Sequence, residues 1–483
     1  MTGKRIALFG AMALLFAPAA AAQSPVPANP LQPQSPYTGS VSAGQPTTEV
    51  LKIGFIDALQ RGLKQNLGAL LAAIGIESAR GEKWKQLSDA LPNVTTDTTE
   101  TATQVNLAQE GFTKIKAPGF SFSAINPIVG PFGYFDTRAY VSVPVFNMNV
   151  WDKVRSANQS LHATQHSYKD ARELVILVVG YNYLQTLSAE SRVETSEAQL
   201  KTADALYNQA SDQFKAGTSP AIDELRAKVE FQTRQQQVIA AHNDYEKQRI
   251  AFARTIGLPA GQPFELTEKI PYDPQPPTTI EEALHRAYST RADYLSAEAQ
   301  VHAAELARRA AVEEYYPTLS FDGNYGVGGP VLDQTHGTFQ VMGSLRVPIF
   351  QGGKVQADVL AADANLTNSR NQLENLRAQI DQDVRDALFD VQSASDEVGV
   401  ARSNVDLATQ TLDQARDRFA AGVTDNIEVV QAQEAVASAN ESLINSLFSY
   451  NVARISLARA QGIAEIGVME YLRGRANATK NGN

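Results

Sequence analysis

The chain has 483 residues, a formal net charge of −10, 43% hydrophobic residues and no cysteine. A chain this acidic is a poor partner for nucleic acid, and without cysteine it holds neither a disulfide nor a lipid-modified N-terminal cysteine. We therefore expect a protein that is not lipidated and that is stabilised by packing and by association with other chains.

The start of the chain has the features of a secretory signal peptide. A basic pair, Lys4 and Arg5, precedes an apolar run over residues 6–17, and small residues follow it. This run is shorter than the roughly 20 residues that span a bilayer, which disfavours the alternative of an uncleaved anchor. We predict a signal peptide at 1–22, followed by a proline-rich linker at 23–50 that is too poor in apolar residues to form a core.

The rest of the chain consists of two similar repeats. Apolar residues seven positions apart in the second half recur 205 residues earlier, as Val384 and Val179 do. The segment RIAFARTIG from Arg249 likewise matches RISLARAQG from Arg454. Strict seven-residue spacing with small residues between is typical of long, closely packed coiled-coil helices. The predicted units are a first repeat at 51–270, an inter-repeat linker at 271–279, a second repeat at 280–465 and a C-terminal tail at 466–483.

Each repeat is predicted to contain a helix, two strands, a long helix and a return helix. The first repeat has these elements at about 54–90, 93–107, 134–147, 149–215 and 221–256. The second has them at about 279–314, 318–327, 337–350, 353–420 and 426–460. A helix of about 67 residues is roughly 100 Å long. The first repeat also has extra residues near 107–134, which we expect to form a surface loop.

The predicted strands alternate between apolar and polar residues. Phe339, Val341 and Leu345 alternate with Gln340 and Ser344. A small soluble sheet gives the same alternation, but the long helices bury their apolar stripes on each other and leave no face to cover such a sheet. Four strands cannot close into a barrel, eight give a filled interior, and twelve from three chains give an open channel.

We therefore predict an internally duplicated α+β membrane protein. Three chains form a twelve-stranded transmembrane β-barrel, with four strands from each protomer. Their long antiparallel coiled-coil helices form a trimeric α-helical barrel.

Between about residues 50 and 465 the chain resembles the TolC-like outer membrane efflux proteins. The segments that carry the resemblance are Ile280–Val301, Val347–Lys354 (VPIFQGGK), Phe214–Leu225 and Phe419–Val430. The resemblance implies a homotrimeric channel in the bacterial outer membrane that spans the periplasm and contacts outer-membrane lipid. It also implies a periplasmic adaptor and an inner-membrane transporter as partners, in efflux or type I secretion.

The resemblance further implies an acidic ring that constricts the periplasmic mouth of the tunnel. At the corresponding positions the chain has Glu428 and Asp223, with Gln431 where a second acid often stands. Three like charges in a narrow lumen attract cations. The alternative is an acid in the first turn of a helix, which the helix dipole favours.

The turns between the long helices are the expected adaptor contacts. They contain Gly217, Thr218 and Ser219 in the first repeat and Gly422, Val423 and Thr424 in the second. Exposed loops at the end of a long rod are suited to binding. A left-handed glycine cap that ends a helix would by itself explain both glycines.

The sequence does not predict an enzyme, a catalytic residue, a cofactor or a metal site. His162 and His166 have a metal-compatible spacing, but no third ligand is evident and a solvated helix face explains them. Two alternatives to a channel are a periplasmic coiled-coil adaptor and a filament-forming structural envelope protein. An adaptor needs only one hairpin, and a filament needs no alternating strands.

Overall fold

The structure is a computed structural model. It describes residues 35–42, 44–109, 116–117, 120–121, 128–274, 278–421, 423–424 and 426–467. The predicted signal peptide, residues 23–34 of the linker, Gly422 and residues 468–483 of the tail lie outside the described residues.

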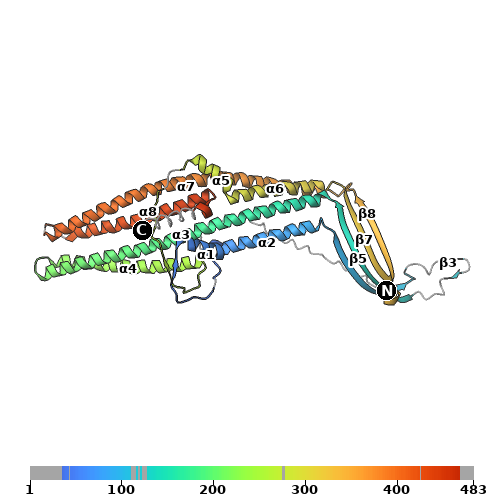
Figure 1. Ribbon diagram of the computed structural model, residues 1–483, viewed down its shortest axis with the longest axis horizontal. Helices are drawn as coiled ribbons and strands as arrows, with labels where there is room; N and C mark the ends of the chain where they lie inside the picture. Colours follow the sequence, from blue (N-terminus) through green and yellow to red (C-terminus); the bar gives the residue numbers. More distant parts are fainter. Residues whose placement is uncertain are drawn as a thin grey trace, which may run out of the picture.

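The chain forms a long bundle of helices with a sheet at one end (Figure 1). The helices and strands of the first repeat are η1 (Pro36–Thr38), β1 (Leu51–Ile53), α1 (Phe55–Gln65), α2 (Leu67–Ser88), β2 (Asn93–Asn106), β3 (Lys116–Ala117), β4 (Phe120–Ser121), β5 (Ile128–Phe146), α3 (Met148–Lys215), α4 (Ala221–Thr255) and β6 (Phe264–Leu266). Those of the second repeat are α5 (Ile280–Thr290), α6 (Ala292–Glu313), β7 (Thr318–Gly329), η4 (Leu332–Gln334), β8 (His336–Arg346), α7 (Lys354–Ala420) and α8 (Asn426–Ala460).

The predicted long helices and strands are confirmed, with three corrections. The helices expected at 54–90 and 279–314 are not continuous, because Asn66 and Arg291 take extended ψ angles of 133° and 121° that end one helix and start the next. The strand expected to reach residue 350 ends at Arg346, two residues before Pro348, which has no N–H for a ladder. Strand β5 begins before its predicted start at 134.

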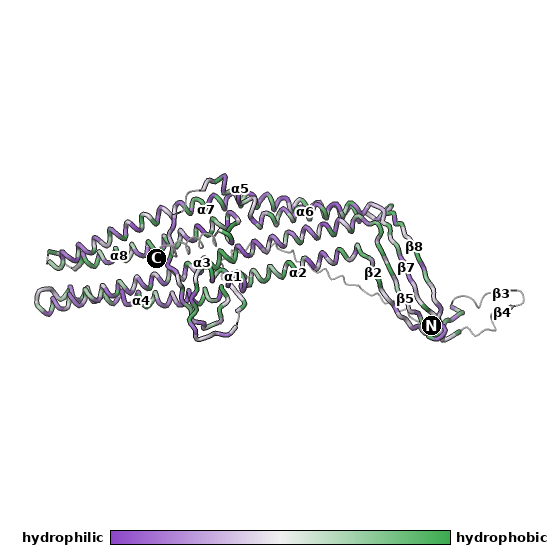
Figure 2. The backbone as a smooth tube through the Cα atoms, viewed as in Figure 1, coloured by the Kyte–Doolittle hydropathy of each residue, from purple (hydrophilic) through white to green (hydrophobic). Residues whose placement is uncertain are grey.

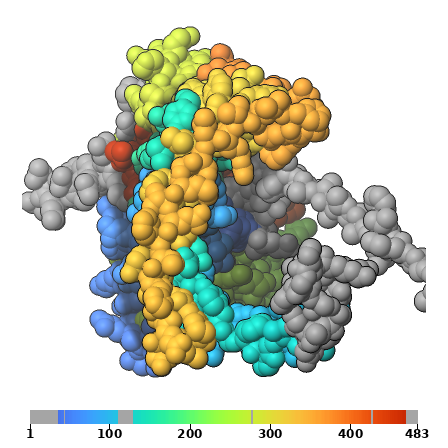
Figure 3. All heavy atoms as spheres, turned by 90° about the vertical axis from the view of Figure 1, so that its right-hand side faces the viewer, coloured from blue at the N-terminus to red at the C-terminus, as the bar shows by residue number. Residues whose placement is uncertain are grey.

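The four long strands form one antiparallel sheet in the order β2-β5-β7-β8. The register aligns Thr96, Ala139, Tyr325 and Phe339 across the sheet, so that most apolar residues of β5, β7 and β8 lie on one face. In Figure 3 the strands β7 and β8 lie open on the surface, with no helix over them. The outer strands β2 and β8 each keep one unpaired edge within the described residues.

The long helices pair as two hairpins, α3 with α4 and α7 with α8, and α3 also packs on α8 and α6. The apolar heptad residues of α7 lie in this contact, and those that are buried include Val384, Val398, Leu412 and Phe419. Hydrophobic and hydrophilic residues alternate along the whole length of these helices (Figure 2). None of the described helices is both long and apolar enough to cross a membrane.

A small belt at the middle of the bundle was not predicted. Strands β1 and β6 pair in parallel over three residues, and η1 packs on α2. The largest apolar core lies here and includes Phe55, Val179, Tyr183 and Phe252. This belt fixes η1 and the ends of α1 and α4 to α3.

Candidate functional site

The first hairpin turn has the geometry of a Schellman cap. Gly217 has a φ of +74°, and its N–H donates to the Phe214 carbonyl at 2.9 Å. The N–H of Thr218 donates to the Gln213 carbonyl at 3.0 Å, as the motif requires. Nothing lies within 4 Å of the position that a Gly217 Cβ would take. The cap therefore explains the glycine, while the turn itself stays open to solvent.

The second turn repeats part of this cap. The N–H of Val423 donates to the Arg418 carbonyl at 3.0 Å, and the Val423 side chain is exposed. Beneath the turns, Leu206 of the first hairpin packs with Phe419 and Val429 of the second. The two hairpin ends are thus joined by an apolar contact just below the turns.

The two acids at equivalent positions of the turns have different surroundings. Asp223 is 6% exposed and accepts a hydrogen bond from Ser219 Oγ at 3.0 Å. The side chain of Glu428 is 41% exposed and lies 3.5 Å from Arg418. Gln431 is exposed one turn further along α8. Of these residues, only Glu428 combines a charge with an accessible side chain.

The polar face of the sheet carries a network that crosses three strands. Arg138 on β5 donates to Asp136 on its own strand, to Asn324 on β7 at 2.8 Å and to Thr338 on β8 at 3.1 Å. These residues all lie on the face opposite to Phe339, as the register requires. One face of the sheet is thus mostly apolar, and the other carries this hydrogen-bonded polar network.

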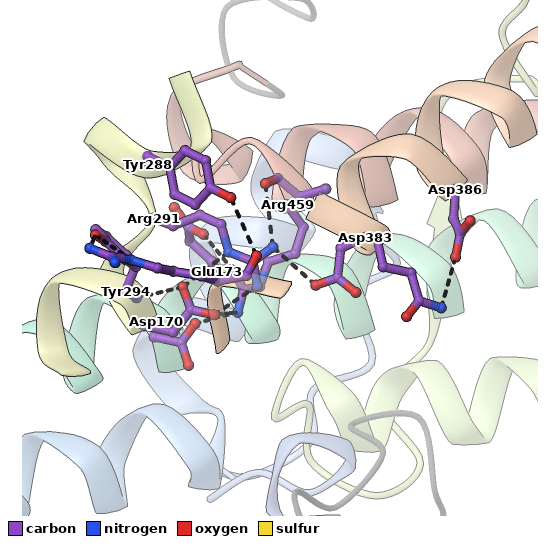
Figure 4. Close-up of polar contacts among 12 residues, drawn as sticks. Asp170, Glu173, Tyr288, Arg291, Tyr294, Asp383, Asp386 and Arg459 are labelled. Carbon is purple, nitrogen blue, oxygen red and sulfur yellow. Dashed lines mark hydrogen bonds and ion pairs between the residues drawn. The ribbon is translucent and has the colours of Figure 1, made fainter. Parts of the chain in front are cut away.

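A buried cluster of charges lies where the two repeats meet in the middle of the bundle (Figure 4). We call it the repeat junction, and its members are Asp170, Glu173, Arg291, Asp293, Asp383 and Arg459. They come from α3, from the break between α5 and α6, from α6 and α7, and from the end of α8.

Two arginines organise the repeat junction. Arg291, which is 4% exposed, donates to both oxygens of Asp293 at 3.1 and 2.7 Å and to Asp383 at 3.0 Å. Arg459 donates to Glu173 at 3.2 Å and to Asp170, both on α3 of the other repeat. Arg459 therefore links the repeats directly.

The carboxylates of the repeat junction have perturbed pKa values. Burial, opposed by Arg459, raises the pKa of Glu173 to about 7, and Asp170 and Asp293 add to the rise. Burial also raises the pKa of Asp170. Burial acts in the same direction on Asp293, but hydrogen bonds from Arg291 outweigh it and lower the pKa of that carboxyl. Glu173 is therefore the member most easily protonated near neutral pH.

The sequence reasoning missed the repeat junction. Its residues stand far apart in the chain, and their spacing matches no motif. The one usable signal was the position of Arg459. This charged residue lies among apolar residues in the segment from Arg454 that matches the first repeat, at the end of the return helix. Among the described residues, no three His, Cys, Asp or Glu side chains are grouped so that they could hold a metal ion.

The chain is similar to known channel proteins. The family described as "Outer membrane efflux protein" matches residues 131–258 and 283–463. Outer membrane protein TolC of Escherichia coli (strain K12) is 20% identical over 334 residues, which cover 66% of this chain and 67% of that protein. Alkaline protease secretion protein AprF of Pseudomonas aeruginosa is 23% identical over 352 residues, which cover 70% of this chain and 72% of AprF.

The fold is also found among solved structures. The open state of the Neisseria gonorrhoeae MtrE outer membrane channel superposes with a TM-score of 0.72 at 17% identity. The match covers 88% of this chain and 95% of that chain. The long helices with one four-stranded sheet per chain are therefore an arrangement shared with that channel.

Proposed function

The chain belongs to the outer membrane efflux protein family, and we propose that three copies of it form the exit duct of an efflux or type I secretion system. Membership of this family makes the chain an outer-membrane transport channel that extends into the periplasm, and not an enzyme. Homology to TolC implies a trimer. The proposal adds that each trimer has a twelve-stranded barrel and a twelve-helix tunnel.

The observation that carries the proposal is that each protomer has two different open edges. The sheet ends in β2 on one side and β8 on the other. The helices end in α2 and α4 on one side and in α7 on the other, because α3, α6 and α8 lie between them. Contact between unlike edges repeats from copy to copy, and it forms a closed ring when the rotation between neighbouring copies closes. The trimer that homology implies is such a closed ring.

Exposed apolar residues on the outer helices support the same closure. Leu225, Val229 and Ile239 are exposed on α4, and Val400 and Leu407 are exposed on α7. Large apolar side chains at seven-residue spacing, such as the last two, are typical of a coiled-coil contact. A neighbouring copy that places its α4 against this α7 would cover both stripes.

A charge placed on the α7 stripe tests the ring. Leu407→Glu should prevent trimer formation, because the carboxylate would have to be buried between protomers. Thr409→Glu adds the same charge to an exposed position about half a helical turn away and should leave trimers intact. Mass measurement of the detergent-purified protein gives the answer, and a Leu407→Glu protein that stays trimeric would exclude α7 from the interface.

Glu428 is the proposed residue of the periplasmic aperture. Its exposed side chain supports this role, whereas the carboxylate of Asp223 is occupied within its own turn. Three copies of Glu428 around a narrow mouth would attract cations. Glu428→Gln should weaken block by a trivalent cation in single-channel recordings, while Glu434→Gln, two turns further along α8, should not. Equal block in all three proteins would remove Glu428 from the aperture.

The two hairpin turns are the proposed docking site for a periplasmic adaptor that joins the channel to an inner-membrane transporter. The turn residues are Gly217, Thr218, Ser219, Gly422, Val423 and Thr424. Gly217→Trp should abolish export while trimers persist, because a bulky side chain would occupy the open space at the turn. Gly261→Trp is the matched control, since Gly261 also has a positive φ and open space but lies away from the turns. Export that survives Gly217→Trp would exclude docking at this turn.

A further inference from the structure

The repeat junction contains more negative than positive charge in a buried place. Its members are four carboxylates and two guanidinium groups, and Arg291 and Arg459 are both already paired. The Nε atom of Arg459 has no hydrogen-bond partner among the described residues. A buried charge without compensation is costly, and such a site relieves the cost by binding a proton.

The groups around Glu173 define which carboxylate takes that proton. Asp293 is held by two hydrogen bonds from Arg291, and Asp383 is the more exposed partner of the same arginine. Arg459 is shared between Glu173 and Asp170. Glu173 lies farther from Arg459 than Asp170 does, and its side chain is 10% exposed, against 22% for Asp170. Glu173 is therefore the carboxylate that takes the proton.

Other charged groups near Glu173 are already paired or belong to its own helix. Arg172 pairs with Glu465, and this pair is neutral as a whole. Lys169 and His166 lie on the α3 surface beside Glu173, and both line the same cavity. Tyr37 of η1 lies close enough to Asp170 and Arg459 for both charges to act on its hydroxyl.

A route for the proton is present. Glu173 lines a cavity of about 940 Å³ between α2, α3, the α5–α6 break and residues 462–466. The cavity is open to solvent, so water can reach the Glu173 carboxylate that lines it. Exchange of the proton with the surrounding solution does not require the bundle to unfold.

We infer that the repeat junction is a proton-controlled latch between the two repeats. A proton on Glu173 leaves Asp170 paired with Arg459 and Asp293 with Arg291, while the remaining carboxylate, Asp383, is 39% exposed to solvent. This state holds α3 to α6 and α8. Loss of that proton adds an uncompensated buried charge and loosens this contact. The inference concerns the helical bundle of one protomer and does not depend on how many copies assemble.

The sign of the pH dependence follows from the two states of Glu173. In the closed junction its pKa is about 7, and in an opened junction the solvated carboxyl returns to its ordinary value of 4.5. Between these values the closed junction holds a proton that the open one releases, so closure weakens as pH rises. The latch is therefore strongest below pH 4.5, weakens through the interval to pH 7 and stays weak above it.

Hydrogen exchange of the purified protein tests the latch. Protection of the amides at 454–462 and 286–295, corrected for intrinsic exchange rates, should fall by at least about tenfold between pH 5 and pH 8, since each pKa unit of difference is tenfold in the opening equilibrium. The equivalent segment at the first break, 61–70, should show no such fall, because neutral hydrogen bonds of Asn66 hold that break.

A matched pair of variants separates the latch from general packing. Glu173→Gln keeps the hydrogen-bonding shape of the protonated side chain and should keep high protection at pH 8. Glu441→Gln removes an ion pair between the same two helices, α3 and α8, at a place away from the junction, and should retain the wild-type pH dependence.

Two outcomes would overturn the latch. One is equal protection of the wild-type segments at pH 5 and pH 8, a result that needs no variant to fold. The other is a Glu173→Gln protein that loses protection with pH as the wild type does. The mass of the same samples reports trimer formation separately, so a failure of the proposed channel would not be mistaken for a failure of the latch.

Discussion

Each repeat breaks its first helix at the same place. The two breaks have the same backbone conformation but different side chains. Asn66 forms the first break and Arg291 the second, with φ angles of −65° and −60°. A glycine that follows the return helix lies against each break. Gly257 meets the first and Gly462 the second, with φ angles of +74° and +68°.

The residue before each break also makes the same long-range contact. The Gln65 amide, oriented so that its nitrogen donates, reaches the Ile256 carbonyl at 3.0 Å. Thr290 Oγ1 donates to the Gln461 carbonyl at 2.6 Å, at the matching position of the second repeat. The glycine and this hydrogen bond are thus common to both breaks, and the side chain at the break itself is free to differ.

The difference at the break is large. Asn66 is neutral, accepts from the Gly68 N–H at 2.9 Å and donates to the Tyr37 carbonyl at 2.6 Å, so η1 covers it. Arg291 is charged and draws Asp293 and Asp383 into a buried cluster. Because the first break folds without any of these charges, the fold does not require them at the second.

The largest effect is expected from removing the charge at the second break. Arg291→Met should destabilise the protein by about 3–5 kcal/mol, because the buried Asp293 would lose both hydrogen bonds from the guanidinium and keep only the Tyr294 N–H at 2.9 Å and Arg459 at 4.0 Å. Thermal unfolding in detergent, followed by circular dichroism, measures the loss. Arg291→Met combined with Asp293→Asn should recover most of it, and Arg385→Met on the exposed side of α7 should change little. A loss that the second substitution does not reduce would contradict this role for the charge.

These breaks also mark the limit of what the sequence predicts. Heptad spacing depends on near neighbours in the chain, so Val384 and its companions located the long helices and the duplication. Alternation in segments such as the one around Val341 located the strands in the same way. The break at Arg291 depends instead on contact with Gly462, which is far away in the chain. Because local spacing does not show this contact, the sequence predicts α5 and α6 as one helix.

The candidate sites likewise differ in how far the sequence alone predicts them. The turns were found because a glycine after a long amphipathic run ends a helix by a local rule. Whether an acid near the turn is buried, as Asp223 is, or accessible, as Glu428 is, depends on side-chain contacts that no spacing encodes. The repeat junction depends on five separate helices and helix ends, and its residues match no local sequence motif.

The next effect in size is expected from the glycines that touch the breaks. A Cβ on Gly462 would lie 2.6 Å from the Arg291 backbone nitrogen, which cannot move aside, so Gly462→Ala should cost about 2–4 kcal/mol. A Cβ on Gly257 would instead meet the Gln65 side chain, which can rotate, and the cost should be smaller. Gly261→Ala, with a positive φ but nothing within 4 Å, should cost only about 1 kcal/mol. The same unfolding measurement ranks the three variants. Equal losses of stability at Gly462 and Gly261 would show that the close approach of Gly462 to the Arg291 backbone does not affect stability.

The smallest effect is expected at the first break. Asn66→Ala should cost about 1–2 kcal/mol, because it removes the cap on the Gly68 N–H and the hydrogen bond to the Tyr37 carbonyl but leaves no buried charge. Asn66→Asp keeps the acceptor and loses the donor, so it should fall between Asn66→Ala and the wild type. Thermal unfolding again measures both. If Asn66→Ala were as costly as Arg291→Met, the two breaks would depend equally on their side chains. The charge at the second break would then have the same stabilising role as the neutral side chain at the first.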